Sequence, residues 1–184
     1  MKVFSMIAVC ATLALAGCDT GGGVQIGADG KPLPQVYRIS SSQAQSIPYR
    51  LLDSVNALRA ARGATALAFN AELNAAAATH SRDMSVQNRP WHFGSDGSSP
   101  LLRVQRVGYT GHLAGELISE TFQTELETLS AWMAQSDTRD VLLDPASNEV
   151  GFAWFQEPSG KIWWTLVTGS TTGSIAPVAT TGGL

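Results

Sequence analysis

Two apolar segments near the C-terminus constrain the fold most strongly, because their order predicts a β-hairpin. Glu149 to Gln156 and Lys161 to Thr168 are rich in valine, phenylalanine and tryptophan, as strands are. Between them, Glu157-Pro158-Ser159-Gly160 has proline and glycine at positions that a tight turn favours. Such a hairpin predicts the core of a sheet that is covered by other elements. An aromatic wall that faces a ligand is the alternative use of these side chains.

Helical patterns before the hairpin predict four helices, which begin near Ser46, Asn70, Pro100 and Thr124. The clearest start is at Thr124, where the Thr hydroxyl and the Glu127 carboxylate form a capping box. Helices in front of an aromatic hairpin are typical of a mixed α and β protein.

The side-chain pattern also predicts which residues face the interior. Arg103 and Arg106 are expected on the solvent side of the third helix, and Leu126 is expected in the buried stripe of the fourth. Residues 113–119 are expected to be extended. Val141 to Leu143 are expected to be an apolar plug before a turn.

One histidine lies on the apolar face of the second predicted helix. His80 shares that face with Leu73 and Met84. A histidine in such a place is more often a buried, hydrogen-bonded core residue than a ligand. Ser81 follows directly, but adjacent helical residues do not face each other, so the pair does not form a nucleophile and base.

The first residues have the pattern of an export signal. Lys2 precedes an apolar run, Val3 to Ala14, which is too short to span a bilayer as a stable helix. Leu-Ala-Gly-Cys, which ends at Cys18, resembles the lipobox of bacterial lipoproteins and implies that an acylated Cys18 anchors the chain to a membrane. A plain secretory signal is the alternative. Asp19 resembles a signal for retention in the inner membrane, and loss of Cys10 would leave no intrachain disulfide.

Composition and these signals together predict the organisation of the chain. We expect a lipoprotein signal peptide at 1–17, a flexible tether at 18–45, a folded domain at 46–170 and a disordered tail at 171–184. The chain has 12 basic and 15 acidic residues. This weakly acidic balance gives no electrostatic reason to expect a nucleic-acid partner.

The order of several short motifs resembles the CAP superfamily (cysteine-rich secretory proteins, antigen 5 and pathogenesis-related proteins), specifically its bacterial SCP-like branch. The motifs are Val55 to Gly63, Leu73 to Met84, His92 to Tyr109, Ala114 to Glu116, Ala131 to Met133, Arg139, Leu142 to Pro145 and Glu149 to Gly151. The resemblance covers about residues 46–170. It implies an α+β fold, a three-layer α-β-α sandwich with a central antiparallel sheet.

The resemblance also implies a cleft, which in many family members holds two histidines and two glutamates. It places the first histidine at His92 and the first glutamate at Glu116, whereas the other two positions are Gln135 and Thr138. A zinc site needs three or four nitrogen, oxygen or sulfur ligands, so no cofactor and no tight zinc binding are expected. His112, in a glycine-rich segment near Glu116, is the residue that could be recruited as a further ligand.

Two functions are compatible with these residues. The first is a membrane-tethered, extracytoplasmic binding or structural module without enzymatic activity, for a small hydrophobic or cell-envelope ligand. The alternative is a hydrolase with His92 as base, Glu116 as its orienting group and Ser81, Ser95 or Ser98 as nucleophile. No spacing places a nucleophile beside the base, and Gly-x-Ser-x-Gly is absent, so we rank binding first. A third role for His92 and Glu116 is structural, in which a hydrogen bond between them joins the loop to the sheet.

Overall fold

The computed structural model describes residues 27–31 and 36–171 of the 184-residue chain. The expected signal peptide, Cys18 and Asp19, and the expected tail beyond residue 171 lie outside the described residues. The chain divides into two units, residues 1–35 and 36–184. In the first unit the described part is a turn, in which Gly27 N–H donates to the Lys31 carbonyl at 2.8 Å.

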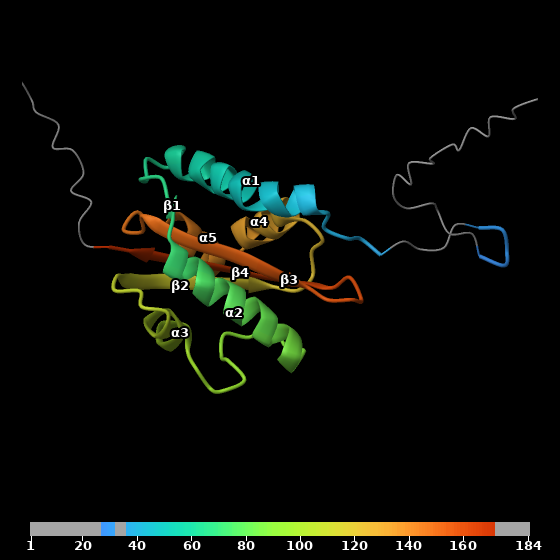
Figure 1. The fold of residues 1–184 in the computed structure, drawn as a ribbon. Coiled ribbons are helices and arrows are strands. Elements are labelled where there is room, and N and C mark those ends of the chain that lie inside the picture. The colour runs from blue at the N-terminus through green and yellow to red at the C-terminus, as the bar shows by residue number, and fades with distance from the viewer. Residues whose placement is uncertain (1–26, 32–35, 172–184) are drawn as a thin grey trace, which may run out of the picture. The chain divides into compact units, whose positions relative to one another are not determined.

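The described part of the second unit contains five helices and a four-stranded sheet (Figure 1). The helices are α1 (Ser41–Ala60), α2 (Ala71–Gln87), α3 (Pro100–Arg106), α4 (Glu125–Ala134) and α5 (Ser136–Leu143), and the strands are β1 (Ala68–Phe69), β2 (His112–Ser119), β3 (Glu149–Gln156) and β4 (Ile162–Ser170). The strand order is β1-β3-β4-β2. The predicted hairpin is therefore confirmed as β3 and β4. The sheet is antiparallel except at β1, which pairs parallel to β3.

Alternate side chains of the two central strands enter two different cores, as a strand buried on both faces requires. Phe152 and Leu166 join the core beneath α1, α4 and α5, whereas Ala153 and Val167 join the core beneath α2 and α3. Figure 1 shows α1 and α4 on one side of the sheet and α2 and α3 on the other. The expected α+β fold with three α-β-α layers is confirmed.

The first helix begins earlier than expected. Ser40 is its N-cap, and the side chain of Gln43 binds back to the Ser40 backbone in a second capping box. The helix therefore starts at Ser41 and not near Ser46, so the end of the segment expected to be a flexible tether belongs to α1.

Two expectations about α4 and the segment after it are wrong. Val141 to Leu143 lie in α5 and are not a separate plug, because an extended Gln135 ends α4 and a new helix follows at once. Leu126 is 46% exposed, and Glu125 is buried in its place. The Glu125 carboxylate is balanced by Arg50, whose Nε lies 2.7 Å from it.

The second helix packs unusually close to the sheet. A Cβ atom added at Gly151 of β3 would lie only 2.1 Å from the carbonyl carbon of Leu73. Ala76 and Ala77 of the same helix are buried against the sheet, and their small side chains permit this short distance. This close packing fixes the position of α2, and with it the position of His80.

Candidate functional site

A buried carboxylate, Glu116 of β2, is surrounded by three basic side chains. Arg103 Nη2 donates to both carboxylate oxygens, at 2.8 Å and 2.6 Å. His92 Nδ1 lies 3.0 Å from Oε1, and His80 Nε2 lies 3.6 Å from the same oxygen. The Glu116 side chain is only 3% exposed. We call these four residues the Glu116 cluster.

Four different segments supply the cluster, so its geometry depends on the packing of α2 and α3 against the sheet. Glu116 comes from β2, where it is paired with Val167 of β4. His80 comes from α2, Arg103 from α3, and His92 from the loop between these helices. The structure thus brings together His92 and Glu116, the two residues that the family resemblance had singled out.

Arg103 is the member that the sequence analysis placed wrongly. It was expected to face solvent, yet its side chain is only 6% exposed. Besides Glu116, it donates to the carbonyls of His92 at 3.0 Å and Ser98 at 2.9 Å, so it also holds the loop in place. The sequence contained an indication that Arg103 is buried, because a buried glutamate usually has a cationic partner. An arginine in the short helix between His92 and Glu116 was a suitable partner.

His80 is a buried core histidine, as the sequence predicted. Its Nε2 lies 3.0 Å from the Trp91 carbonyl oxygen, and Nδ1 has no hydrogen-bond partner within the described chain. Burial lowers the pKa of His80, and this effect exceeds the opposing attraction of Glu116. The ring is therefore neutral at neutral pH, with its proton on Nε2. It supports the loop rather than forming an ion pair.

His92 is the only member of the cluster that is open to solvent, with a side chain 51% exposed. When neutral it donates from Nδ1 to Glu116, which leaves Nε2 as an acceptor. Chemically, such a histidine can accept a proton or bind a polar ligand group.

The other two positions of the family's histidine and glutamate set do not supply charged ligands. Gln135 lies at the junction of α4 and α5, and the Thr138 hydroxyl donates to the Trp132 carbonyl. His112 lies four residues before Glu116, which is roughly 13 Å along an extended strand. No group of three or more histidine, cysteine or carboxylate side chains suited to a metal occurs in residues 27–31 and 36–171.

Glu116 itself is also poorly suited to a metal, because the Arg103 guanidinium binds both of its oxygens. A divalent cation would have to displace this guanidinium or lie beside its positive charge. The side chains present therefore do not fit a tetrahedral zinc site.

The three serines considered as nucleophiles are buried or form hydrogen bonds with groups other than His92. The Ser81 hydroxyl is buried against oxygen atoms of the sheet, and the Ser95 hydroxyl donates to Asp83 at 2.6 Å. Ser98 is almost completely buried. Among the described residues, no hydrogen bond joins any of the three to His92. The structure thus places no activated serine beside the candidate base.

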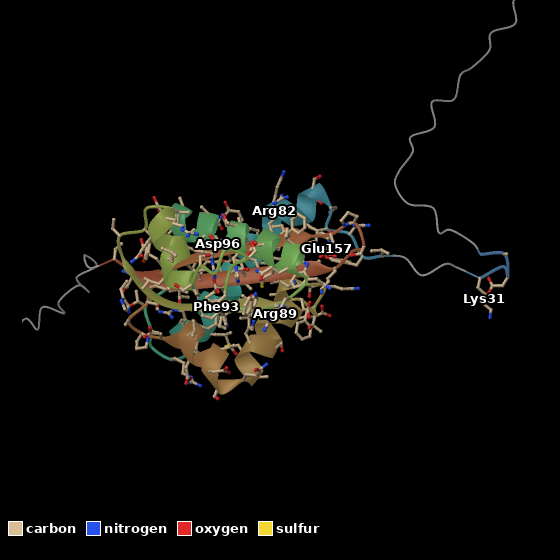
Figure 2. All side chains as sticks on the ribbon, turned by 90° about the horizontal axis from the view of Figure 1, so that it is seen from below. Lys31, Arg82, Arg89, Phe93, Asp96 and Glu157 are labelled. Atoms are coloured by element: carbon tan, nitrogen blue, oxygen red, sulfur yellow. The ribbon has the colours of Figure 1, made fainter. Side chains whose placement is uncertain are left out.

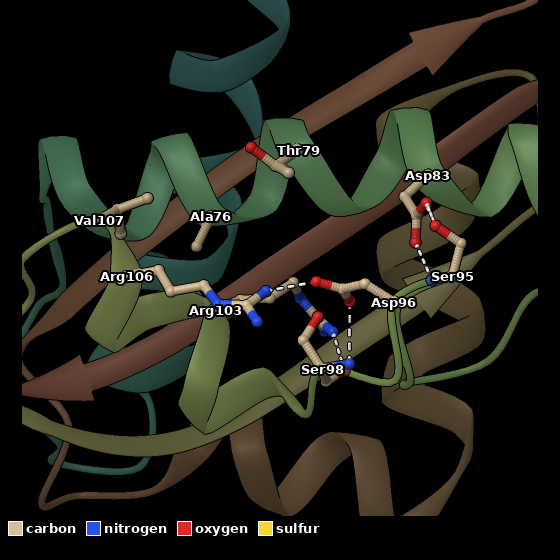
Figure 3. Close-up of a pocket in the computed structure, with 9 residues that line it drawn as sticks. All are labelled: Ala76, Thr79, Asp83, Ser95, Asp96, Ser98, Arg103, Arg106 and Val107. Carbon is tan, nitrogen blue, oxygen red and sulfur yellow. Dashed lines mark hydrogen bonds and ion pairs between the residues drawn. The ribbon is translucent and has the colours of Figure 1, made fainter.

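One cavity lies next to the cluster, between α2, α3 and the loop that joins them. It has a volume of about 250 Å³. We call it the α2–α3 cavity, and its lining consists of Ala76, Thr79, Asp83, Ser95, Asp96, Ser98, Arg103, Arg106 and Val107 (Figure 3). Phe93 and Asp96, at the outer surface of the same loop, are labelled in Figure 2.

A second cavity, of about 360 Å³, lies where β2 ends beside α4. We call it the β2–α4 cavity, and its lining consists of Pro90, Ile118, Ser119, Glu120, Thr121, Phe122, Ala131, Trp132 and Gln135. Gln135, which replaces a glutamate of the family set, therefore faces a hollow with both apolar and polar walls.

A three-layer α-β-α sandwich with a histidine and a glutamate at these two positions is the arrangement of a CAP domain. The model of the cysteine-rich secretory protein (CAP) family matches residues 52–168, and the chain belongs to this family. The uncharacterized protein YkwD of Bacillus subtilis (strain 168) is 27% identical over 122 residues. The match covers 66% of this chain and 47% of YkwD, so the chain spans about half the length of that relative.

Solved structures show the same fold. An outer surface protein of Borrelia burgdorferi has a TM-score of 0.64 at 13% identity, over 69% of this chain and 94% of that one. An extracellular protein of Bacillus anthracis that contains an SCP domain has a TM-score of 0.62 at 19% identity, over 73% of this chain and 45% of that one. At such low identity the similarity establishes the fold alone. In the described ranges, no helix has both the length and the apolar character needed to cross a membrane.

Proposed function

We propose that this chain is a non-enzymatic binding module that works outside the cytoplasm. The observation that carries the proposal is the state of Glu116, whose two oxygens are both bound by Arg103. A carboxylate held in this way supports the packing of loop and sheet and is not available for a reaction. The extracytoplasmic location is supported by family membership and by the extracellular and outer-surface proteins of the same fold.

The β2–α4 cavity is the place where we expect a ligand. Ile118, Phe122 and Trp132 give it apolar walls, and Gln135 contributes a neutral amide that can both donate and accept hydrogen bonds. Its other lining residues include Ser119 and Glu120, so the cavity has polar as well as apolar walls. Sites for small molecules combine apolar walls with polar groups that fix the orientation of the ligand. The ligand class is therefore a small molecule of the cell envelope with an apolar body and one polar group.

Binding is tested with the full-length chain and the fluorescent probe 1-anilinonaphthalene-8-sulfonate. Ala131→Phe places a ring in the cavity and is expected to weaken probe binding about tenfold or more, because it removes the volume that the probe fills. Ala134→Phe is the matched control, since Ala134 is exposed and does not line the cavity. Equal binding by the two variants would exclude the β2–α4 cavity as the site.

Hydrolysis of p-nitrophenyl acetate separates this proposal from the hydrolase alternative. We expect the same rate for the wild-type chain and for His92→Gln. Turnover that depends on His92 would overturn the non-enzymatic proposal.

We further propose that an acylated Cys18 tethers the module to a membrane, on the basis of the Leu-Ala-Gly-Cys sequence. Cys18→Ala is expected to move the protein from the membrane fraction to the soluble fraction. Cys10→Ala is the control, because the proposed cleavage removes this residue. A Cys18→Ala variant that still sediments with membranes would contradict the anchor.

A further inference from the structure

We propose that the α2–α3 cavity binds a short zwitterionic peptide of two or three residues. Its terminal carboxylate lies at Arg106, and its terminal ammonium lies at Asp83. This site is separate from the β2–α4 cavity and does not depend on the function proposed for that cavity.

Four charged side chains line the cavity, namely Asp83, Asp96, Arg103 and Arg106, and Arg106 forms an ion pair with Asp96. In Figure 3, Arg106 and Val107 lie at one end, and Asp83 and Ser95 lie at the other. A ligand with one positive and one negative end matches this division, whereas a simple anion or a simple cation matches only one end.

The basic end has unused hydrogen-bond donors. The guanidinium of Arg103 donates to the carbonyls of His92 and Ser98 and to Glu116, so Arg106 is the arginine of this cavity that is open to a ligand. Arg106 is half exposed, and its one hydrogen bond among the described residues runs from Nη1 to Asp96. Its remaining N–H groups can therefore bind a carboxylate.

The acidic end has an unbalanced charge. The Asp83 carboxylate accepts hydrogen bonds from Ser95 N at 2.7 Å, Ser95 Oγ at 2.6 Å and Gln87 Nε2 at 2.9 Å. These occupy three of about four acceptor positions of a carboxylate. No ion pair of the described residues includes Asp83. An ammonium group would supply both the fourth hydrogen bond and the missing positive charge.

The dimensions of the cavity limit the length of the ligand. Its α2 wall extends from Ala76 to Asp83, which is about 10 Å at the rise of an α-helix. An extended peptide covers about 3.3–3.6 Å per residue, so two or three residues bridge the two ends. The volume of about 250 Å³ is small for a ligand site, which favours small side chains next to Ala76 and Val107.

The test is calorimetric titration of the full-length chain with L-alanyl-L-alanine and D-alanyl-D-alanine. Preference for the D form would identify a cell-wall peptide as the source, and preference for the L form a peptide derived from protein. Either result supports the site. N-acetylated and C-amidated dipeptides, each of which lacks one terminal charge, are expected to bind about tenfold or more weakly.

Three variants locate the site. Arg106→Gln and Asp83→Asn each remove one charge and are expected to weaken dipeptide binding about tenfold or more. Thr79→Phe fills the cavity from an exposed position on α2 and is expected to abolish binding. Arg62→Gln and Asp137→Asn are the matched controls, because both residues are exposed and lie outside the cavity.

Four results would overturn the proposal. The first is no heat of binding with either dipeptide, and the second is equal affinity for the blocked dipeptides. The third is unchanged binding by Arg106→Gln when circular dichroism shows the native fold. The fourth is equally tight binding of acetate, which would make the cavity an anion site only.

Discussion

At the scale of single residues, Arg103 is the charged hydrogen-bond partner of the buried Glu116 side chain. Arg103→Gln removes the guanidinium and leaves a buried carboxylate without its charged partner. Breaking a buried ion pair in this way costs about 3–5 kcal/mol, so we expect the free energy of unfolding at neutral pH to fall by about that amount. Urea unfolding followed by circular dichroism measures the change.

A second substitution distinguishes loss of charge balance from loss of packing. Arg103→Gln combined with Glu116→Gln removes both charges, and we expect it to recover part of the stability lost by Arg103→Gln alone. Arg62→Gln is the control for an exposed arginine. If Arg103→Gln destabilises the protein no more than Arg62→Gln does, Arg103 does not have the role assigned to it.

His80 makes stability depend on pH. Burial lowers its pKa in the folded protein below the usual value of about 6.5, so the unfolded chain binds a proton more readily. The free energy of unfolding therefore falls as the pH falls from about 6.5 toward the folded-state pKa, and His80 contributes no slope above this window. In His80→Gln we expect a smaller loss of stability over the same pH range, measured by urea unfolding at each pH. An unchanged slope would show that other groups control it.

At the scale of secondary-structure elements, Gly151 sets the distance between β3 and α2. A methyl group there would meet backbone atoms of Leu73 and Asn74, which cannot move without shifting the helix. Overpacking of this kind typically costs about 1–3 kcal/mol, and we expect Gly151→Ala to lose at least this much in thermal unfolding. Gly94→Ala is the control, because the nearest atoms there are the side-chain ends of Ser98 and Asp96. A larger loss in Gly94→Ala would contradict the close approach of α2.

The elements that the sequence predicted well are those with local signals. The capping box at Thr124 and the turn at Glu157 to Gly160 determine their own backbone geometry, so α4 and the hairpin were predicted close to their observed bounds. β1 has only two residues and exists because Ala68 and Phe69 pair with β3, which no local pattern reveals. The capping box of Ser40 was a local signal as well, but the polar composition of the preceding residues concealed it.

At the scale of the whole molecule, the order of motifs predicted which loop and strand meet at the candidate site, but not how the charges there are balanced. His92 and Glu116 are in contact, as their positions in the family pattern implied. Arg103 was missed because a helix of seven residues is too short for its hydrophobic pattern to show which side faces the sheet. Arg103 is buried because α3 packs against β2, and the sequence alone does not show this packing.

The last prediction concerns the whole site and its capacity for zinc. We expect the full-length chain to bind no stoichiometric zinc at micromolar concentration, because Arg103 holds Glu116 and the two remaining family positions are Gln135 and Thr138. Gln135→Glu combined with Thr138→His is expected to create measurable zinc affinity, since it adds two ligands to His92. Calorimetric titration and metal analysis of both proteins provide the comparison.

Each contrary result has a specific meaning. Tight one-to-one binding by the wild-type chain would mean that another residue completes the site, and would bring metal-assisted hydrolysis ahead of binding as the function. If the double variant binds no zinc, then positions 135 and 138 do not face His92, and the family pattern has been placed on the wrong residues of this chain.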